Sequence, residues 1–295
     1  MRFSCIHTHT VFCDGSDDVE TCCRAAFEKG LVSLGFSAHA PIFKKTGIQT
    51  TWHLGEERLE EYIKTVREAQ KRWEGKLPVY LGLEVDYIHG LTGPSDNDYR
   101  EMDLDFIIGS VHYVIPPQGA PFTVDDPIED MERNIKKHFG GDPLAMVEAY
   151  WNCQEAMIRA GGFDVLGHPD LVKKNNSIPR GRENLFFCES AASYQKRAAA
   201  LAALMARTGL PAEINTGGMN RGRTRNCYPS PDFLKLFRGN GVPMVINADA
   251  HQAEHIGGYY EEARQSLLAA GYSETLLFEG SRDGKAVWGR EMLRN

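Results

Sequence analysis

Seven short apolar runs recur along this chain of 295 residues, and each ends in a polar residue that can bind a metal ion or a substrate. In a barrel of parallel strands, the carboxyl ends of the strands lie on one face, so residues that are distant in sequence can meet there. The runs therefore predict a functional site built from strand ends. They occupy residues 3–9, 31–39, 77–86, 104–112, 163–170, 210–218 and 242–251.

Segments of helical character separate these runs, and the alternation predicts an α/β fold with parallel strands joined by right-handed crossovers. We count seven strands; residues 275–279 could form an eighth but carry no ligand candidate. The predicted architecture is a distorted seven-stranded (β/α)7 TIM-like barrel, with residues 1–295 in one domain and the metal site at the strand C-terminal face. The expected helices occupy 18–29, 56–73, 143–160, 184–208, 231–239 and 254–270.

Two long segments, 41–55 and 116–142, interrupt the alternation after the second and fourth runs. Both lie on the carboxyl side of a predicted strand, where long loops often form or cover an active site. We therefore expect both segments to supply walls of a substrate site.

The composition argues against several classes of partner. Lys+Arg total 33 and Asp+Glu total 40, so the formal net charge of −7 makes a nucleic-acid partner an unfavourable interpretation. No apolar stretch approaches the roughly 18 residues of a membrane span, and the amino terminus leads directly into a predicted strand. The seven cysteines form no CxxC pair. We expect a cytoplasmic protein with reduced thiols and no membrane partner; the oligomeric state stays open.

Histidines and carboxylates gather at the ends of the apolar runs. His7 and His9 are two residues apart, so the strand period directs both side chains to the same side, and Asp249 and His251 repeat this spacing. One such histidine is more often a hydrogen-bonded residue without a metal, but the pattern recurs after six runs. Imidazole with carboxylate suits zinc, manganese or iron, and nine candidates exceed the ligands that one ion needs, so the pattern predicts two or three divalent transition metal ions. The nine candidates are His7, His9, Asp14, His39, Glu84, His112, His168, Asp249 and His251.

Several motifs resemble those of the polymerase and histidinol phosphatase (PHP) family: HTH with a following DG, SAHAP, GLEVDY, GSVHY, GHPDL, EINTGG and NADAH. They run in family order from His7 to His251, nearly the whole chain. Within the family, GSVHY, the EINT segment with a following arginine, and DAHxxxxIG are most similar to the histidinol-phosphate phosphatases. The resemblance implies a distorted seven-stranded barrel with a trinuclear metal centre.

The resemblance also implies how the ligands divide among three ions. One ion would be held by His7, His9, Glu84 and Asp249. A second ion, bridged by Glu84, would be completed by His112 and His168. The third would be held by Asp14, His39 and His251. The candidate catalytic residues are Glu84, Asp249 and His251, and no general acid for the leaving group is assigned.

Such a centre suits the hydrolysis of a phosphate monoester. Three divalent ions outweigh the charge of three carboxylates, and a bridging hydroxide, the expected nucleophile, still leaves a net positive site for a phosphate dianion. Arg221 occupies the place of the family's phosphate-binding arginine, with Arg223 nearby and Lys173 after GHPD; any of them could instead lie on a solvated basic loop. His255, like His53, His89 and His138, lacks the strand-end placement, but it could approach substrate from the last loop.

The favoured function is a metal-dependent phosphatase that hydrolyses L-histidinol phosphate in histidine biosynthesis, the substrate being what the resemblance implies. One alternative is a PHP-type phosphodiesterase or nuclease acting on nucleotides or another small phosphate ester, although the net charge counts against polymeric substrates. A second alternative is a non-catalytic metal-binding barrel, whose signature would be missing ligands. All nine family ligand positions carry ligand-capable residues here.

Overall fold

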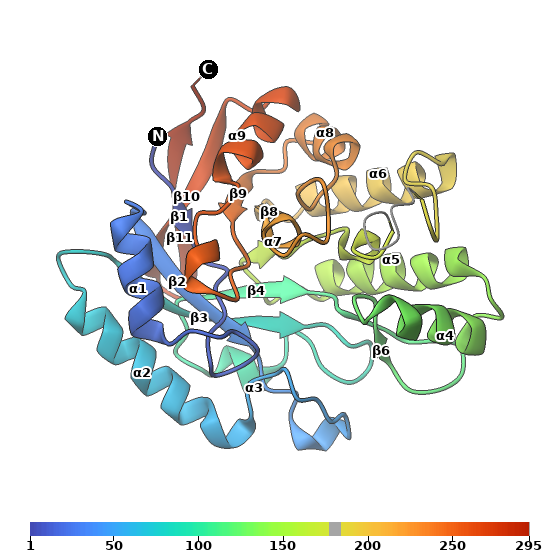
Figure 1. The fold of residues 1–295 in the computed structure, drawn as a ribbon, viewed down its shortest axis with the longest axis horizontal. Helices are drawn as coiled ribbons and strands as arrows, with labels where there is room; N and C mark the ends of the chain where they lie inside the picture. The colour runs from blue at the N-terminus through green and yellow to red at the C-terminus, as the bar shows by residue number, and fades with distance from the viewer. Residues whose placement is uncertain (177–183, 295) are drawn as a thin grey trace.

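The computed structural model describes residues 1–176 and 184–294, and its centre is a curled, mostly parallel sheet (Figure 1). The sheet has nine strands in the order β1-β2-β3-β4-β7-β8-β9-β10-β11. Its first seven strands lie in the seven predicted apolar runs and all pair in parallel. They are β1 (Ser4–Cys5), β2 (Ser33–His39), β3 (Val79–Asp86), β4 (Phe106–Ser110), β7 (Val165–Leu166), β8 (Ala212–Asn215) and β9 (Met244–Asn247).

The predicted count of seven strands was wrong, because a C-terminal hairpin adds two more. β10 (Glu274–Arg282) pairs in parallel with β9, and β11 (Lys285–Met292) pairs antiparallel with β10. The turn between them contains Asp283 and Gly284, both at positive φ, which is the sequence and geometry that a tight hairpin favours. An ion pair between Arg2 and Glu291 joins the hairpin to the start of the chain.

Helices surround the sheet, with α1 and α2 on one side and α5, α6, α8 and α9 around the other (Figure 1). Asp18 caps α1 by accepting a hydrogen bond from the backbone N–H of Thr21. Asp142 caps α5, and Pro143 is the first residue of that helix. The helices are α1 (Val19–Glu28), α2 (Leu59–Arg72), α3 (Asn97–Arg100), α4 (Ile128–His138), α5 (Pro143–Ala160), α6 (Ala192–Ala206), α7 (Gly217–Asn220), α8 (Pro231–Gly239) and α9 (Tyr260–Ala269). Short 3₁₀ turns occur at η1 (Lys44–Thr46), η2 (Glu56–Arg58), η3 (Leu171–Lys173) and η5 (Ala253–His255).

The segment 116–142 is not a plain loop. It contains β6 (Phe122–Thr123), which pairs with β5 (Tyr113–Val114) outside the main sheet, and then α4. A backbone hydrogen bond from Val124 N to His112 O continues this pairing (2.8 Å). The residues after β6 are therefore held beside the carboxyl end of β4.

Apolar packing fills both faces of the sheet. The larger cluster lies between the sheet and the helices, and a smaller one includes Ile6, Phe106 and Phe278. A Cβ atom at position 82 would lie 2.4 Å from the Phe106 ring, so Gly82 is required for that ring to lie across β3.

The segments that follow β1 and β9 also meet at the carboxyl face of the sheet. A parallel bridge joins Thr8 to Ala250, with hydrogen bonds from His9 N to Ala250 O (2.8 Å) and from Ala250 N to His7 O (3.1 Å). The segments after β1 and β9 are thereby fixed next to each other. Among the described residues, no helix is long and apolar enough to cross a membrane.

Candidate active site

The residues that follow β1 and β9 form the first part of a buried polar cluster. His7 and His9 are almost fully buried, and both direct Nε2 toward Asp249 Oδ1, at 3.7 Å and 3.3 Å respectively. Asp249 has φ of 48°, a backbone conformation that is strained for a residue other than glycine. A Cβ atom at position 217 would lie 2.6 Å from Asp249 Oδ2, so Gly217 leaves room for this carboxylate.

Glu84, two residues before the end of β3, is the centre of the cluster. Its Oε2 lies 3.2 Å from His7 Nε2, 3.5 Å from His9 Nε2 and 2.9 Å from His39 Nδ1. Its Oε1 lies 2.8 Å from His168 Nε2 and 3.8 Å from His112 Nε2. One buried carboxylate thus faces imidazoles contributed by β1, β2, β4 and β7 or the segments that follow them.

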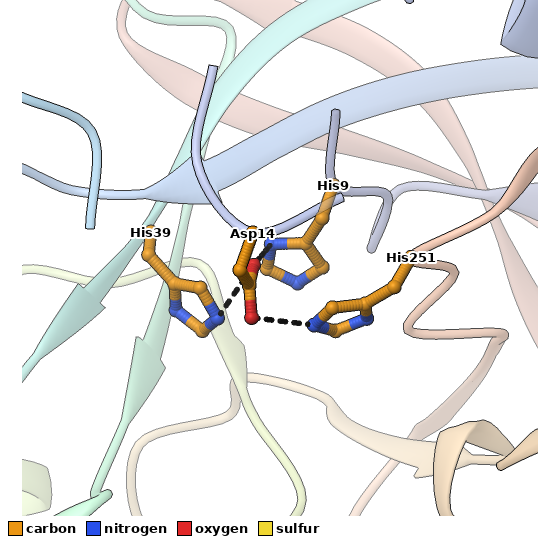
Figure 2. A group of neighbouring side chains, drawn as sticks. All are labelled: His9, Asp14, His39 and His251. Atoms are coloured by element: carbon orange, nitrogen blue, oxygen red, sulfur yellow. Dashed lines mark hydrogen bonds and ion pairs between the residues drawn. The ribbon is translucent and has the colours of Figure 1, made fainter. Parts of the chain in front are cut away.

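A second group lies nearer the surface, around Asp14. Figure 2 shows His9, His39 and His251 directed at this carboxylate. The Asp14 Oδ1 atom lies 3.6 Å from His39 Nε2 and 3.8 Å from His9 Nδ1, and its Oδ2 atom lies 3.1 Å from His251 Nε2. The four residues come from the segments after β1 and β9 and from the end of β2, so the group exists only in the folded chain.

The chemistry of these atoms fits divalent cations. Four buried atoms that converge here make ion-pair contacts with one another but no well-aligned hydrogen bond within the described chain: His7 Nε2, His9 Nε2, His39 Nδ1 and Glu84 Oε2. Buried polar atoms without a hydrogen bond are rare in proteins, and an ion is one explanation for them. Grouped ligand atoms within 4.8 Å of one another include His7 with His9 and Asp249, and His7 with Glu84 and His168. Imidazole and carboxylate donors of this kind suit zinc, manganese or iron.

The carboxylates of the cluster are held in the charged form. Burial alone would raise the pKa of Glu84, but His7, His39 and His112 lower it well below its usual value. Burial likewise opposes ionisation of Asp249, whose pKa is nevertheless lowered well below its usual value by Arg221 and His7. Burial lowers the pKa of His9 to about 3, assisted by repulsion from His251 and His39. Metals bind neutral imidazoles and ionised carboxylates, so ions bound here would displace the protons that the neighbouring carboxylates favour on His7, His39 and His112.

Glu213, inside β8, supports this cluster and was missed by the sequence analysis. Its Oε2 accepts a hydrogen bond from His7 Nδ1 (2.9 Å), and its Oε1 accepts one from the backbone N–H of His168 (2.8 Å). The amides of Asn215 and Asn247 donate to the same carboxylate, at 2.7 Å and 2.9 Å. Glu213 therefore fixes the His7 ring with Nε2 facing the cluster, as outer carboxylates do for metal-bound histidines.

Asp86, the last residue of β3, performs the same task for His112. Its Oδ1 lies 2.9 Å from His112 Nδ1, and its Oδ2 lies 2.9 Å from His53 Nε2. Burial opposes the shift, but Asp86 and Glu84 together raise the pKa of His112 to about 10. His53 belongs to the predicted wall segment 41–55, and its Nδ1 contacts the Thr50 hydroxyl (3.1 Å). Through these two contacts His53 joins the segment 41–55 to the cluster.

A cavity of about 260 Å³ opens onto the cluster. His39, His112, His168, Asp249 and His251 form one part of its wall. Trp52, from the segment 41–55, and Asp125 and Asp126, from the segment 116–142, form another, so the structure places residues of both predicted wall segments here.

Arg221 also lines the cavity, just after α7. Its Nη2 lies 3.0 Å from Asp249 Oδ2, and its Nη1 donates to His251 Nδ1 at 2.6 Å. Burial alone would lower the pKa of Arg221, but Asp249 raises it, so the guanidinium keeps its charge. Its buried Nε has no hydrogen-bond partner among the described residues. A fixed cation of this geometry beside the cluster can receive an anionic oxygen.

The other predicted substrate-binding residues lie elsewhere. Lys173 is buried, with Nζ 3.0 Å from Asp170 Oδ2 and 2.8 Å from Cys227 O, so it neutralises an internal carboxylate and does not line the cavity. Its neighbour Lys174 lines the cavity instead, paired with Asp125 (2.8 Å). Arg223 is exposed, and neither it nor His255 is among the described residues that line the cavity. A substrate contact of Arg223 or His255 stays a prediction.

Comparisons with known proteins agree with the fold. Residues 6–217 match the family model described as PHP domain. A protein of Deinococcus radiodurans named "Probable histidinol-phosphatase" is 30% identical over 268 residues, covering 90% of this chain and 92% of that protein.

Two solved structures share the architecture. A candidate histidinol phosphatase from Listeria monocytogenes superposes with a TM-score of 0.76 at 24% identity, covering 88% of this chain and 99% of that one. The histidinol phosphate phosphatase of Lactococcus lactis, solved with zinc, L-histidinol and phosphate, superposes with a TM-score of 0.69 at 20% identity, covering 97% of this chain and 99% of that one. At these identities the two likenesses concern the fold.

Proposed function

The chain belongs to the PHP domain family, and we propose that it is a metal-dependent phosphomonoesterase. Its substrate would be L-histidinol phosphate, which it would hydrolyse to L-histidinol and phosphate. The observation that supports this proposal most strongly is the convergence of nine histidines and carboxylates from six strand ends in one cluster, which opens onto a cavity that also contains a charged arginine. The relative from Deinococcus radiodurans supports the choice of substrate. We further propose that residues 1–295 form one PHP-type domain whose curled, mostly parallel sheet makes a distorted TIM-like barrel.

The nine residues divide into sets that could each hold one ion. We assign a first ion to His7, His9, Glu84 and Asp249. Glu84 would also reach a second ion, together with His112 and His168. A third would be held by Asp14, His39 and His251. The short distances within each set support this division, and zinc, manganese or iron would fit the donors.

Divalent ions bound here would polarise the phosphoryl group and lower the pKa of bound water toward neutrality. The side chains of the protein would bind the phosphate and orient the metal ligands. Arg221 would bind a phosphoryl oxygen through its guanidinium, which Asp249 and His251 already hold in place. Glu213 and Asp86 would keep the imidazoles of His7 and His112 oriented. The cavity of about 260 Å³ has room for a small phosphate ester.

The substrate assignment is tested by phosphate release. Purified protein loaded with zinc, manganese or iron should hydrolyse L-histidinol phosphate with a kcat/KM at least about tenfold above that for p-nitrophenyl phosphate, because additional contacts to the leaving alcohol stabilise the transition state. Equal turnover of both esters would reject L-histidinol phosphate as the preferred substrate. Faster turnover of a diester, such as bis-p-nitrophenyl phosphate, would favour a PHP-type phosphodiesterase instead.

The pair His53 and Asp86 gives a further test of the second ion. Replacing His53 by alanine should weaken binding of one metal ion by about 10- to 100-fold, because Asp86 then loses the partner that holds it against His112. Titration of metal-free protein with zinc, followed by calorimetry, measures the change. His138→Ala is the matched control, because His138 lies at the exposed end of α4 and bonds Gln118 O. Unaltered affinity for every ion in His53→Ala would contradict the proposed role.

A further inference from the structure

The wall of the cavity that faces the candidate metal ligands contains two neighbouring carboxylates, Asp125 and Asp126. They follow β6, whose continuation is bonded to His112 O through Val124 N (2.8 Å). The Asn175 amide also donates to Asp126 O (2.7 Å). Their backbone is therefore fixed relative to the cluster and is not a free loop.

The two carboxylates differ in whether a cation of the described residues forms a direct ion pair with them. Asp125 pairs with Lys174 (2.8 Å); although burial opposes ionisation, Lys174 and His112 lower its pKa to about 2. Asp126 forms no ion pair within the described residues, and its carboxylate accepts a hydrogen bond from the Thr123 hydroxyl. Burial raises the pKa of Asp126, and repulsion from Asp125 acts in the same direction, against a smaller opposing effect of Lys174. Asp126 is thus a half-buried, positioned carboxylate that forms no direct ion pair with a cation of the described residues.

An unpaired carboxylate is unexpected in a cavity suited to a phosphate dianion. It would repel the phosphate, and holding it half-buried is unfavourable unless a cation approaches. Both costs disappear if the substrate carries a positive group beyond its phosphate. Arg221 and the metal ligands would then receive the anionic end, and Asp126 the cationic end.

We propose that Asp126 is a specificity-determining residue that binds a cationic nitrogen, an ammonium or an imidazolium, in the leaving alcohol of the phosphate ester. This inference rests on the proposed phosphomonoesterase function and narrows it to zwitterionic esters. Asp125 would have a different task, because Lys174 already neutralises it. Thr123 orients the Asp126 carboxylate, as its hydroxyl bond indicates.

The test compares esters with and without a cation. Asp126→Asn keeps the shape of the side chain and removes the charge, so the ratio of kcat/KM for L-histidinol phosphate to that for p-nitrophenyl phosphate should fall by about 10- to 100-fold. O-phosphoethanolamine, which carries only the ammonium, should show the same loss if that group is the one recognised. The control is Asp130→Asn, which removes a carboxylate from α4 outside the cavity and should keep the ratio.

Two further outcomes separate this inference from the proposed function. An equal loss on both esters in Asp126→Asn would show a structural role and overturn the inference, as would an unchanged ratio. Binding of L-histidinol itself, measured by calorimetry in the presence of zinc and inorganic phosphate, does not depend on turnover. Binding that is weakened by Asp126→Asn supports the inference even if L-histidinol phosphate is not the preferred substrate, and absence of binding to the unsubstituted protein overturns it.

Discussion

Replacing Glu84 by glutamine is expected to lower kcat for phosphate ester hydrolysis by on the order of 1,000-fold or more. The substitution keeps the size of the side chain and removes the negative charge that faces five imidazoles. Two of the proposed ion sites share Glu84, so a single change should deplete both. Steady-state phosphate release gives the rate, and elemental analysis of the purified variant gives the metal content, which should fall together with activity.

The matched control is Glu28→Gln, because Glu28 is an exposed glutamate at the end of α1 and does not line the cavity. It should retain both metal and activity. Circular dichroism should show that Glu84→Gln keeps its secondary structure, since the surrounding apolar core is intact. A Glu84→Gln protein with full activity would exclude the proposed arrangement of the ions, whatever its metal content.

The strands and the strand-end ligands could be predicted because they rest on local patterns. Each parallel strand is an apolar run, and the end of each run marks the face on which a site forms. The structure brings together all nine residues that this reasoning selected, including Asp14 and His251, which are 237 positions apart.

The supporting carboxylates could not be selected in the same way. Glu213 stands inside the apolar run that becomes β8, two residues before its end, where the alternation of a strand gives no reason to expect a charge. Its partners His7, His168 and Asn247 come from three other segments, so its role exists only in three dimensions. An acidic residue within an otherwise apolar strand was nevertheless a usable signal, because such a residue is seldom buried without a partner.

The strand count was wrong for a local reason. The dipeptide Asp283–Gly284 between β10 and β11 is a strong turn signal, but these two strands carry no ligand candidate and were not counted. The substrate contact of Lys173 stays a prediction, whereas Lys174 lines the cavity, because neighbouring residues in a 3₁₀ turn point about 120° apart. The sequence does not show which of the two lysines points into the cavity. In the structure, the buried Asp170 forms an ion pair with Lys173.

Arg221 was selected from its position after the sixth run, and the structure adds that it contacts two proposed metal ligands. Its Nη2 meets Asp249 Oδ2 and its Nη1 meets His251 Nδ1. The residue could therefore act on the phosphate, on the ligands or on both. Because the side chain is held by Asp249 at the edge of the cavity, a phosphoryl oxygen entering there would meet a cation that needs no rearrangement.

Replacing Arg221 by alanine is expected to lower kcat/KM by about 100- to 1,000-fold, because a fixed cation is lost where charge accumulates on the phosphoryl oxygens. The inhibition constant of inorganic phosphate should rise in the same variant, whereas the metal content should stay close to that of the unsubstituted protein. Arg207→Ala is the matched control, since this arginine is exposed just after α6 and does not line the cavity, and it should alter neither quantity. If Arg221→Ala loses its metal as well, the guanidinium acts mainly by holding Asp249 and His251. Arg221→Lys distinguishes the two roles, because a lysine can supply the charge but cannot bond both ligands and a phosphoryl oxygen with the geometry of a fork.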